Sequence, residues 1–150
     1  MSIEFREIWA VDFEFRPRSD NRPAPVVCMV AMELISGKII RLWEEELYVR
    51  NSPPFPTSKD TLILAYNLMA EMSCFLVLGW ELPARCIDLF VEFRNITNGL
   101  ILPHGMNLPG ALMYFGVDGL SSMEKKGLIQ KILENDTYSA KLKKEILDYC

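Results

Sequence analysis

The sequence predicts an α/β fold in which a mixed β-sheet is covered by helices. Three observations lead to this prediction. Three consecutive strand-like segments open the chain, strand-like and helix-like segments then alternate, and the final part is helical in pattern. The chain has 150 residues, half of them hydrophobic, which is the length and apolar content of one folded domain spanning residues 1–150.

The first three segments predict neighbouring strands. Residues 8–15 (IWAVDFEF) are apolar on both faces for most of their length, which is typical of a central strand. Residues 26–34 (VVCMVAMEL) are predicted to form a second strand. Residues 38–47 are predicted to form a third strand, which returns antiparallel to the second after a turn at Ser36-Gly37.

Strands and helices alternate in the middle of the chain. We expect strands at residues 62–65 and 85–89, and helices at residues 68–78 and 90–96. The Gly- and Pro-containing residues 98–109 are predicted to be a loop. Helical spacing then recurs at residues 111–115, 122–134 and 139–149, with Ser139 as a plausible N-cap of the last helix.

Composition bounds the function. The net charge of −4 argues against a protein that binds nucleic acid through a broad surface, but less against a nuclease, whose acidic site recruits cations. A basic cluster occurs only in the last segment. The lysines of this cluster are Lys125, Lys126, Lys131, Lys141, Lys143 and Lys144. We favour a solvated helical face over a patch that binds a nucleic-acid backbone.

Neither a zinc site nor a membrane span is expected. The chain has no Cys-x-x-Cys pair and a single histidine. Glu71 interrupts the apolar residues 62–80, and a charge at the centre of a spanning helix costs roughly 2.5–3.5 kcal/mol. The chain opens without a signal-peptide pattern. We therefore expect a cytoplasmic protein, in which Cys28, Cys74 and Cys86 are buried, reduced thiols.

Asp12 and Glu14 are the sharpest chemical feature of the sequence. Residues two apart on a strand point to the same face, so both carboxylates converge at the end of an apolar strand. Two adjacent carboxylates repel each other, and a divalent cation removes that repulsion. Oxygen ligands select Mg²⁺ or Mn²⁺ over zinc. The alternative is a solvated pair at an exposed strand end.

A third carboxylate, Glu71, lies within an apolar helical segment. Its neighbours leave little polar face, so we expect a buried and partnered glutamate rather than a surface one. Asp88 has two interpretations, a metal contact or the simpler N-cap of the following helix.

Three segments resemble the motifs of one family, the 3′–5′ proofreading exonuclease domains of family-A DNA polymerases (DNA polymerase I-like proteins). They are Asp12-Phe13-Glu14, residues 67–71 (NLMAE) and Asp148-Tyr149-Cys150. In the family these are Asp-x-Glu on the first strand, an asparagine followed by an aromatic residue and an aspartate on a helix, and the start of Tyr-x-x-x-Asp on the last helix. The similarity covers essentially the whole chain, including residues 87–89 and 111–116.

The resemblance implies a ribonuclease-H-like fold and metal-dependent hydrolysis of single-stranded DNA or RNA from the 3′ end. It implies two Mg²⁺ or Mn²⁺ ions, with Asp12 bridging both, Glu14 on the ion that activates water and Glu71 on the other. Asn67 belongs to the second motif and is expected at the substrate. Tyr149 is expected to orient the attacking water, with core packing as its alternative role.

Departures from the family pattern define the competing hypothesis. Ala70 replaces the aromatic residue of the second motif, and Glu71 replaces its aspartate. The aspartate of the third motif would fall three residues after Cys150, so we expect residues 1–150 to lack the last helical turn of the domain. The alternative function is a catalytically inactive ribonuclease-H-like interaction module. The resemblance also allows a polymerase domain to follow in a longer parent protein.

Phe13 and Phe15, which flank Glu14, have two interpretations. Aromatic rings beside a nuclease site stack on the terminal base of single-stranded substrates. Strand alternation instead turns both rings away from the carboxylates and into the core.

Overall fold

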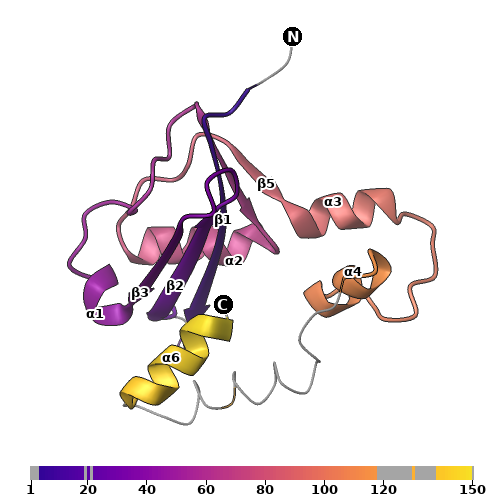
Figure 1. Cartoon of the computed structure of the whole chain (residues 1–150). Helices are drawn as coiled ribbons and strands as arrows, with labels where there is room; N and C mark the ends of the chain where they lie inside the picture. Colours follow the sequence, from indigo (N-terminus) through magenta and orange to yellow (C-terminus); the bar gives the residue numbers. More distant parts are fainter. Residues whose placement is uncertain (1–3, 19, 21, 118–129, 131–137, 150) are drawn as a thin grey trace.

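A computed structural model describes residues 4–18, 20, 22–117, 130 and 138–149. A five-stranded sheet forms its centre (Figure 1). The strands are β1 (Glu7–Phe15), β2 (Val26–Glu33), β3 (Ile39–Trp43), β4 (Thr61–Ala65) and β5 (Cys86–Asp88). The helices are α1 (Glu44–Leu47), α2 (Leu68–Val77), α3 (Leu89–Ile96), α4 (Leu108–Tyr114) and α6 (Ala140–Tyr149).

The sheet is mixed, with the strand order β3-β2-β1-β4-β5. β2 pairs antiparallel with both β1 and β3, whereas β1 pairs parallel with β4 and β4 pairs parallel with β5. The predicted class, a mixed sheet with antiparallel strands first and alternating strands and helices afterwards, is confirmed. β1 occupies the central position that its apolar sequence predicts.

Helices cover the two faces of the sheet. In Figure 1, α2 lies behind the strands and α6 in front of their lower ends. The first apolar cluster joins Phe13 of β1 to Phe75 of α2, and the second joins Cys28 of β2 to Ile146 of α6. The β1–β2 register shifts between Glu14 and Phe15. Because of this irregularity, the neighbouring residues Val27 and Cys28 of β2 both pack in the second cluster.

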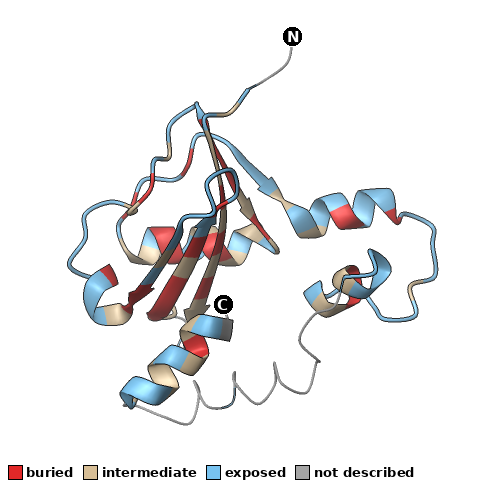
Figure 2. Cartoon of the chain, in the orientation of Figure 1, coloured by how far each residue is buried: buried red, intermediate tan, exposed pale blue. Residues whose placement is uncertain are grey.

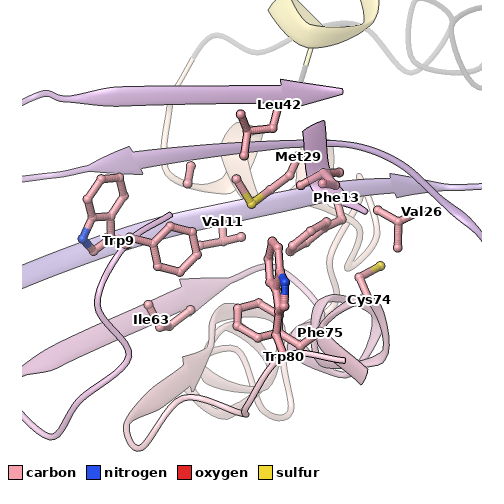
Figure 3. Packing of buried hydrophobic residues seen from close by; sticks show 13 residues of the cluster. Trp9, Val11, Phe13, Val26, Met29, Leu42, Ile63, Cys74, Phe75 and Trp80 are labelled. Carbon is pink, nitrogen blue, oxygen red and sulfur yellow. The ribbon is translucent and has the colours of Figure 1, made fainter. Parts of the chain in front are cut away.

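Aromatic rings fill the first cluster (Figure 3). Phe75 is fully buried and lies edge-on to Trp80 at a centroid distance of 5.5 Å and to Phe13 at 5.8 Å. Trp9 stacks on Phe55 at 5.2 Å. Such ring pairs add about 0.5–1.5 kcal/mol each beyond the burial of their area. Figure 2 shows this burial on β1, β2 and α2, whereas α3 is largely exposed.

The third predicted strand, residues 38–47, is too long. The strand ends at Trp43, and Glu44–Leu47 form the short helix α1. The side chain of Glu46 accepts a hydrogen bond from the Trp43 amide at 3.0 Å, which caps the helix, and three acidic residues lie in its first turn. Leu47, the last residue of α1, is buried in the core, so the segment remains apolar in pattern although its backbone changes from strand to helix.

The helices after β4 and β5 start at defined caps. Asn67 has a φ of 74°, a left-handed conformation that asparagine tolerates. Asp88 caps α3, because its Oδ1 accepts hydrogen bonds from the amides of Phe90 at 2.9 Å and Val91 at 3.3 Å. Its Oδ2 accepts a third from the Leu68 amide at 3.0 Å. The N-cap interpretation of Asp88 is confirmed, and the same carboxylate joins the starts of α2 and α3.

Helix α4 begins earlier than predicted. The predicted loop over residues 98–109 gives way to helix at Leu108, with Pro109 in the first turn, where a missing N–H is tolerated. The side chain of Asn107 caps this helix by accepting from the Gly110 amide at 2.9 Å. An added Cβ at Gly110 would lie 2.5 Å from the carbonyl oxygens of His104 and Gly105.

We expect Gly110→Ala to destabilise the protein by roughly 1–3 kcal/mol, because the new methyl group meets backbone oxygens that have no rotamer to change. Urea unfolding would measure the loss, and Met113→Ala on the exposed side of the same helix serves as the control. Equal stability of the two variants would show that the 104–105 backbone moves aside freely.

Several other predictions have definite outcomes. Cys28 and Cys74 are buried as predicted, but Cys86 is exposed on the edge strand β5, so its predicted burial is wrong. Ser139 acts as the predicted N-cap, accepting from the Leu142 amide at 3.2 Å. The predicted helix over residues 122–134 lies outside the described residues, except for Gln130. No helix in the described part of the chain is long and apolar enough to cross a membrane.

Candidate active site

Asp12 and Glu14 lie on the sheet face that α6 covers. Phe13, between them, belongs to the first cluster, so strand alternation turns the two carboxylates to the opposite face. Glu14 is paired with Cys28 across the strands, and Cys28 packs against Ile146 of α6. Both acids are partly buried. Both acids therefore lie on the sheet face that packs against α6 through Cys28.

Glu71 reaches the same strand from the other layer. It is 4% exposed, and its Oε2 accepts a hydrogen bond from the Phe13 amide at 2.9 Å. The amide belongs to the residue between Asp12 and Glu14, so the third carboxylate lies beside the first two. The prediction that Glu71 is buried and partnered is confirmed.

The pairing of the sheet explains why the Phe13 amide is available. β4 pairs with β1 only from Glu7 to Ala10, so residues 11–15, more than half of β1, extend beyond its parallel neighbour. A buried amide without a partner is costly, and the Glu71 carboxylate takes the place of the missing strand. The pairing of the sheet thus gives Glu71 a structural reason to point at the Phe13 amide.

The electrostatics of the three acids are coupled. Burial, and after it the charge of Asp12, raises the pKa of Glu71 to about 9. The Phe13 amide opposes this rise, and Glu14 adds to it. Burial and the same three carboxylates also raise the pKa of the Cys74 thiol, one turn further along α2. In the absence of a cation, Glu71 therefore keeps its proton at neutral pH.

The three predicted substrate-binding residues have different positions. Asn67 is exposed at the start of α2, four residues before Glu71, and is open to a ligand. Phe15 packs partly against the first cluster and lines a cavity of about 520 Å³ between the β1–β2 loop and α2. Phe13 is 3% exposed and contacts Phe75, so its ring serves the core and the stacking interpretation for Phe13 is wrong in this arrangement.

Tyr149 is the last residue of α6, the helix that lies over the acidic pair's face of the sheet. Its side chain lies outside the described residues, so its predicted role stays a prediction. Leu142 and Ile146 of the same helix pack in the second cluster. Arg41 lies 3.8 Å from the carboxylate of Asp148, which adds a contact between α6 and β3.

Two features near the site were missed by the sequence interpretation. Arg16 directly follows β1, and its guanidinium donates to the Tyr138 hydroxyl at 2.8 and 3.0 Å. These two residues are 122 positions apart, and no local pattern links them. The cavity beside Phe15 was also missed, although the small side chain of Ala70, at a position where the resembled motif has an aromatic residue, is a signal for it.

The donor chemistry of the site suits a hard divalent cation, since all three acids offer oxygen ligands. Burial is the main cause of the raised pKa of Glu71, and a cation would relieve the repulsion by Asp12 and Glu14 that adds to it. As the side chains are placed, the described residues contain no group of three or more His, Cys, Asp and Glu side chains that could hold a metal ion. One oxygen of Glu71 is occupied by the Phe13 amide.

Comparison of the chain with family models, with curated proteins and with solved structures finds no match. The geometry of the acidic site and the chemistry of its residues therefore provide the basis for a functional hypothesis.

Proposed function

We propose that the chain is a metal-dependent 3′–5′ exonuclease domain of the ribonuclease-H-like type, acting on single-stranded DNA or RNA ends. One observation carries the proposal. The Glu71 carboxylate, from α2, is hydrogen-bonded to the amide between Asp12 and Glu14 on β1. The carboxylate of Glu71 thus lies next to the strand residues that carry the other two acids. The strand order and directions of the sheet are compatible with this fold.

The proposed roles follow from where each residue lies. Asp12 and Glu14 would hold the cations from the strand, and Glu71 would do so from α2. Mg²⁺ or Mn²⁺ bound there would lower the pKa of a water molecule and stabilise the leaving 3′ oxygen. Glu71 must lose its proton to bind a cation, so binding releases a proton near neutral pH. For Tyr149, the role of orienting the attacking water comes from the family resemblance alone.

Substrate would approach along the start of α2. Asn67 is exposed there and offers amide donors to a phosphate or a base. Phe15 and the neighbouring cavity provide an apolar surface for the terminal base, which leaves Phe13 to the core. In a longer parent protein, a polymerase domain could supply the ends that this domain would trim.

The test is release of labelled mononucleotide from a 3′-labelled single-stranded oligonucleotide in Mn²⁺. DNA and RNA versions should be compared. It uses the chain as it stands and a version with Ala-Ala-Asp added after Cys150, which completes the Tyr-x-x-x-Asp pattern. We expect the extended version to be the more active one. Ala-Ala-Asn in place of Ala-Ala-Asp is the matched control for the added carboxylate.

Asp12→Asn should lower this activity at least about 100-fold, because positioned catalytic groups typically supply 10²–10⁴-fold. Asp60→Asn, an exposed acid that lies 3.9 Å from Arg6, is the control and should retain full activity. Equal activity of wild type and Asp12→Asn would assign any hydrolysis to a contaminant.

A second candidate function is a non-catalytic interaction module of the same fold. The Glu71–Phe13 hydrogen bond favours it, since that bond satisfies the amide left unpaired by β4 without any cation. Calorimetric titration with Mn²⁺ separates the two functions. Mn²⁺ binding by the wild type that disappears in Asp12→Asn supports the nuclease. Absence of Mn²⁺ binding in both the wild type and Asp12→Asn supports the interaction module.

A further inference from the structure

Arg16 connects the end of the acidic strand to the segment that starts the last helix. It follows β1 directly, two residues after Glu14, and its amide donates to the Pro25 carbonyl at 3.0 Å, which fixes its backbone beside the start of β2. Its Nη2 and Nε donate to the Tyr138 hydroxyl at 2.8 and 3.0 Å. Its guanidinium carbon also lies 5.1 Å from the centre of that ring.

Tyr138 carries this contact into α6. The next residue, Ser139, caps the helix by accepting from the Leu142 amide at 3.2 Å. The Tyr138 ring lies edge-on to Trp43, at the end of β3, with a centroid distance of 5.1 Å. Because the ring is held from two sides, the first turn of α6 is fixed relative to both β1 and β3.

A second contact with the Trp43 ring lies about one turn further along α6. The ammonium of Lys143 lies 5.0 Å from the centre of the Trp43 ring and is 2.6 Å from the carboxylate of Glu45 in α1. In the next turn of α6, the side chain of Ile146 is fully buried against β2. These contacts fix where α6 begins and which face it turns to the sheet, and the ten-residue helix carries that placement to its C-terminal end.

We propose that Arg16 and Tyr138 are positioning residues, which hold the start of α6 at the end of β1 and so set how α6 lies on the sheet face that carries Asp12 and Glu14. This inference rests on the proposed nuclease function for its catalytic consequence. The placement of α6 itself does not depend on that function. Neither residue was singled out by the sequence, because 122 positions separate them.

The test removes only the hydroxyl that receives both bonds. Tyr138→Phe keeps the ring against Trp43 but leaves the Arg16 guanidinium without its acceptor. Amide hydrogen exchange of α6 should become roughly tenfold faster, while exchange in α2 stays unchanged. Tyr114→Phe in α4 is the matched control, because its ring packs against Phe93 on another part of the fold.

In the extended version of the chain, Tyr138→Phe should lower kcat by roughly tenfold, as expected for a hydrogen bond to a charged group, and leave KM within about twofold. Arg16→Lys keeps the charge and one donor, so it should recover part of kcat relative to Arg16→Met. A change in overall stability alone would not produce this separation of kcat from KM.

The outcomes are distinguishable. Unchanged exchange of α6 in both Tyr138→Phe and Arg16→Met would overturn the proposal, whatever the activity. Faster exchange combined with a raised KM and an unchanged kcat would also overturn it, and would place Arg16 at the substrate. If wild type proves inactive with all substrates, the nuclease function fails, and hydrogen exchange alone decides whether Arg16 and Tyr138 fix α6.

Discussion

Glu71→Gln is expected to raise the free energy of unfolding at pH 8 by roughly 2–4 kcal/mol in metal-free buffer. Glutamine has the same shape and keeps an oxygen for the Phe13 amide, but it has no proton to lose. In the wild type, burial and the neighbouring Asp12 make the ionised carboxylate unfavourable. The variant therefore removes a cost and retains the hydrogen bond.

The pKa of Glu71 also predicts how the free energy of unfolding changes with pH. The pKa of Glu71 is about 9 in the folded chain and 4.5 for an ordinary glutamate, so the folded state binds more protons between these values. The stability of the wild type should fall as pH rises through this window, by up to about 1.4 kcal/mol per pH unit from this group. Glu71→Gln should lack this part of the slope.

Chemical denaturation at pH 5, 6.5 and 8, with a chelator present, would measure both effects. Glu81→Gln, an exposed glutamate in a loop, is the control and should follow the wild type. The same slope in wild type and Glu71→Gln would contradict the raised pKa. Added Mn²⁺ should stabilise the wild type more than Glu71→Gln, because a cation that binds only the folded site shifts unfolding by mass action.

Phe75→Ala is expected to destabilise the protein by about 3–5 kcal/mol, the usual cost of removing a buried ring. Phe75 is completely buried, and its ring contacts Phe13, Phe55 and Trp80. The aromatic pairing lost with the ring adds to the cavity that alanine leaves. A loss of this size is a large fraction of the stability of a small domain.

Urea unfolding, followed by tryptophan fluorescence, would measure this loss. Leu76→Ala is the matched control, because the adjacent leucine is 65% exposed on the outer side of the same helix. Its change should stay within about 0.5 kcal/mol, as is usual for surface substitutions. Similar losses for the two variants would contradict the description of α2 as a helix with one buried and one exposed side.

The order of the elements could be predicted from the sequence because each depends on a short-range pattern. The apolar run of residues 8–15 gave the central strand, and the Ser36-Gly37 turn gave the antiparallel return to β3. Errors occurred where a local interaction between polar groups competed with the apolar pattern. The Glu46 cap converted the end of the third predicted strand into α1, and Asn107 started α4 before the predicted boundary.

The candidate site was predictable in its residues but not in its contacts. The spacing of Asp12 and Glu14 on a strand is enough to place both on one face. An apolar neighbourhood is enough to indicate that Glu71 is buried. The bond from Glu71 to the Phe13 amide depends on where β4 stops pairing with β1, which is a property of the sheet rather than of any one segment.

The sequence by itself determined the central strand, the burial of Glu71 and the common direction of Asp12 and Glu14, because periodicity and side-chain polarity act over a few residues. The tertiary structure alone decided that Glu71 from α2 would meet Phe13 of β1, that α6 would lie over the acidic face, and that Arg16 would reach Tyr138. These contacts join residues 58 to 122 positions apart, so they form only once the sheet and its two helical layers are assembled.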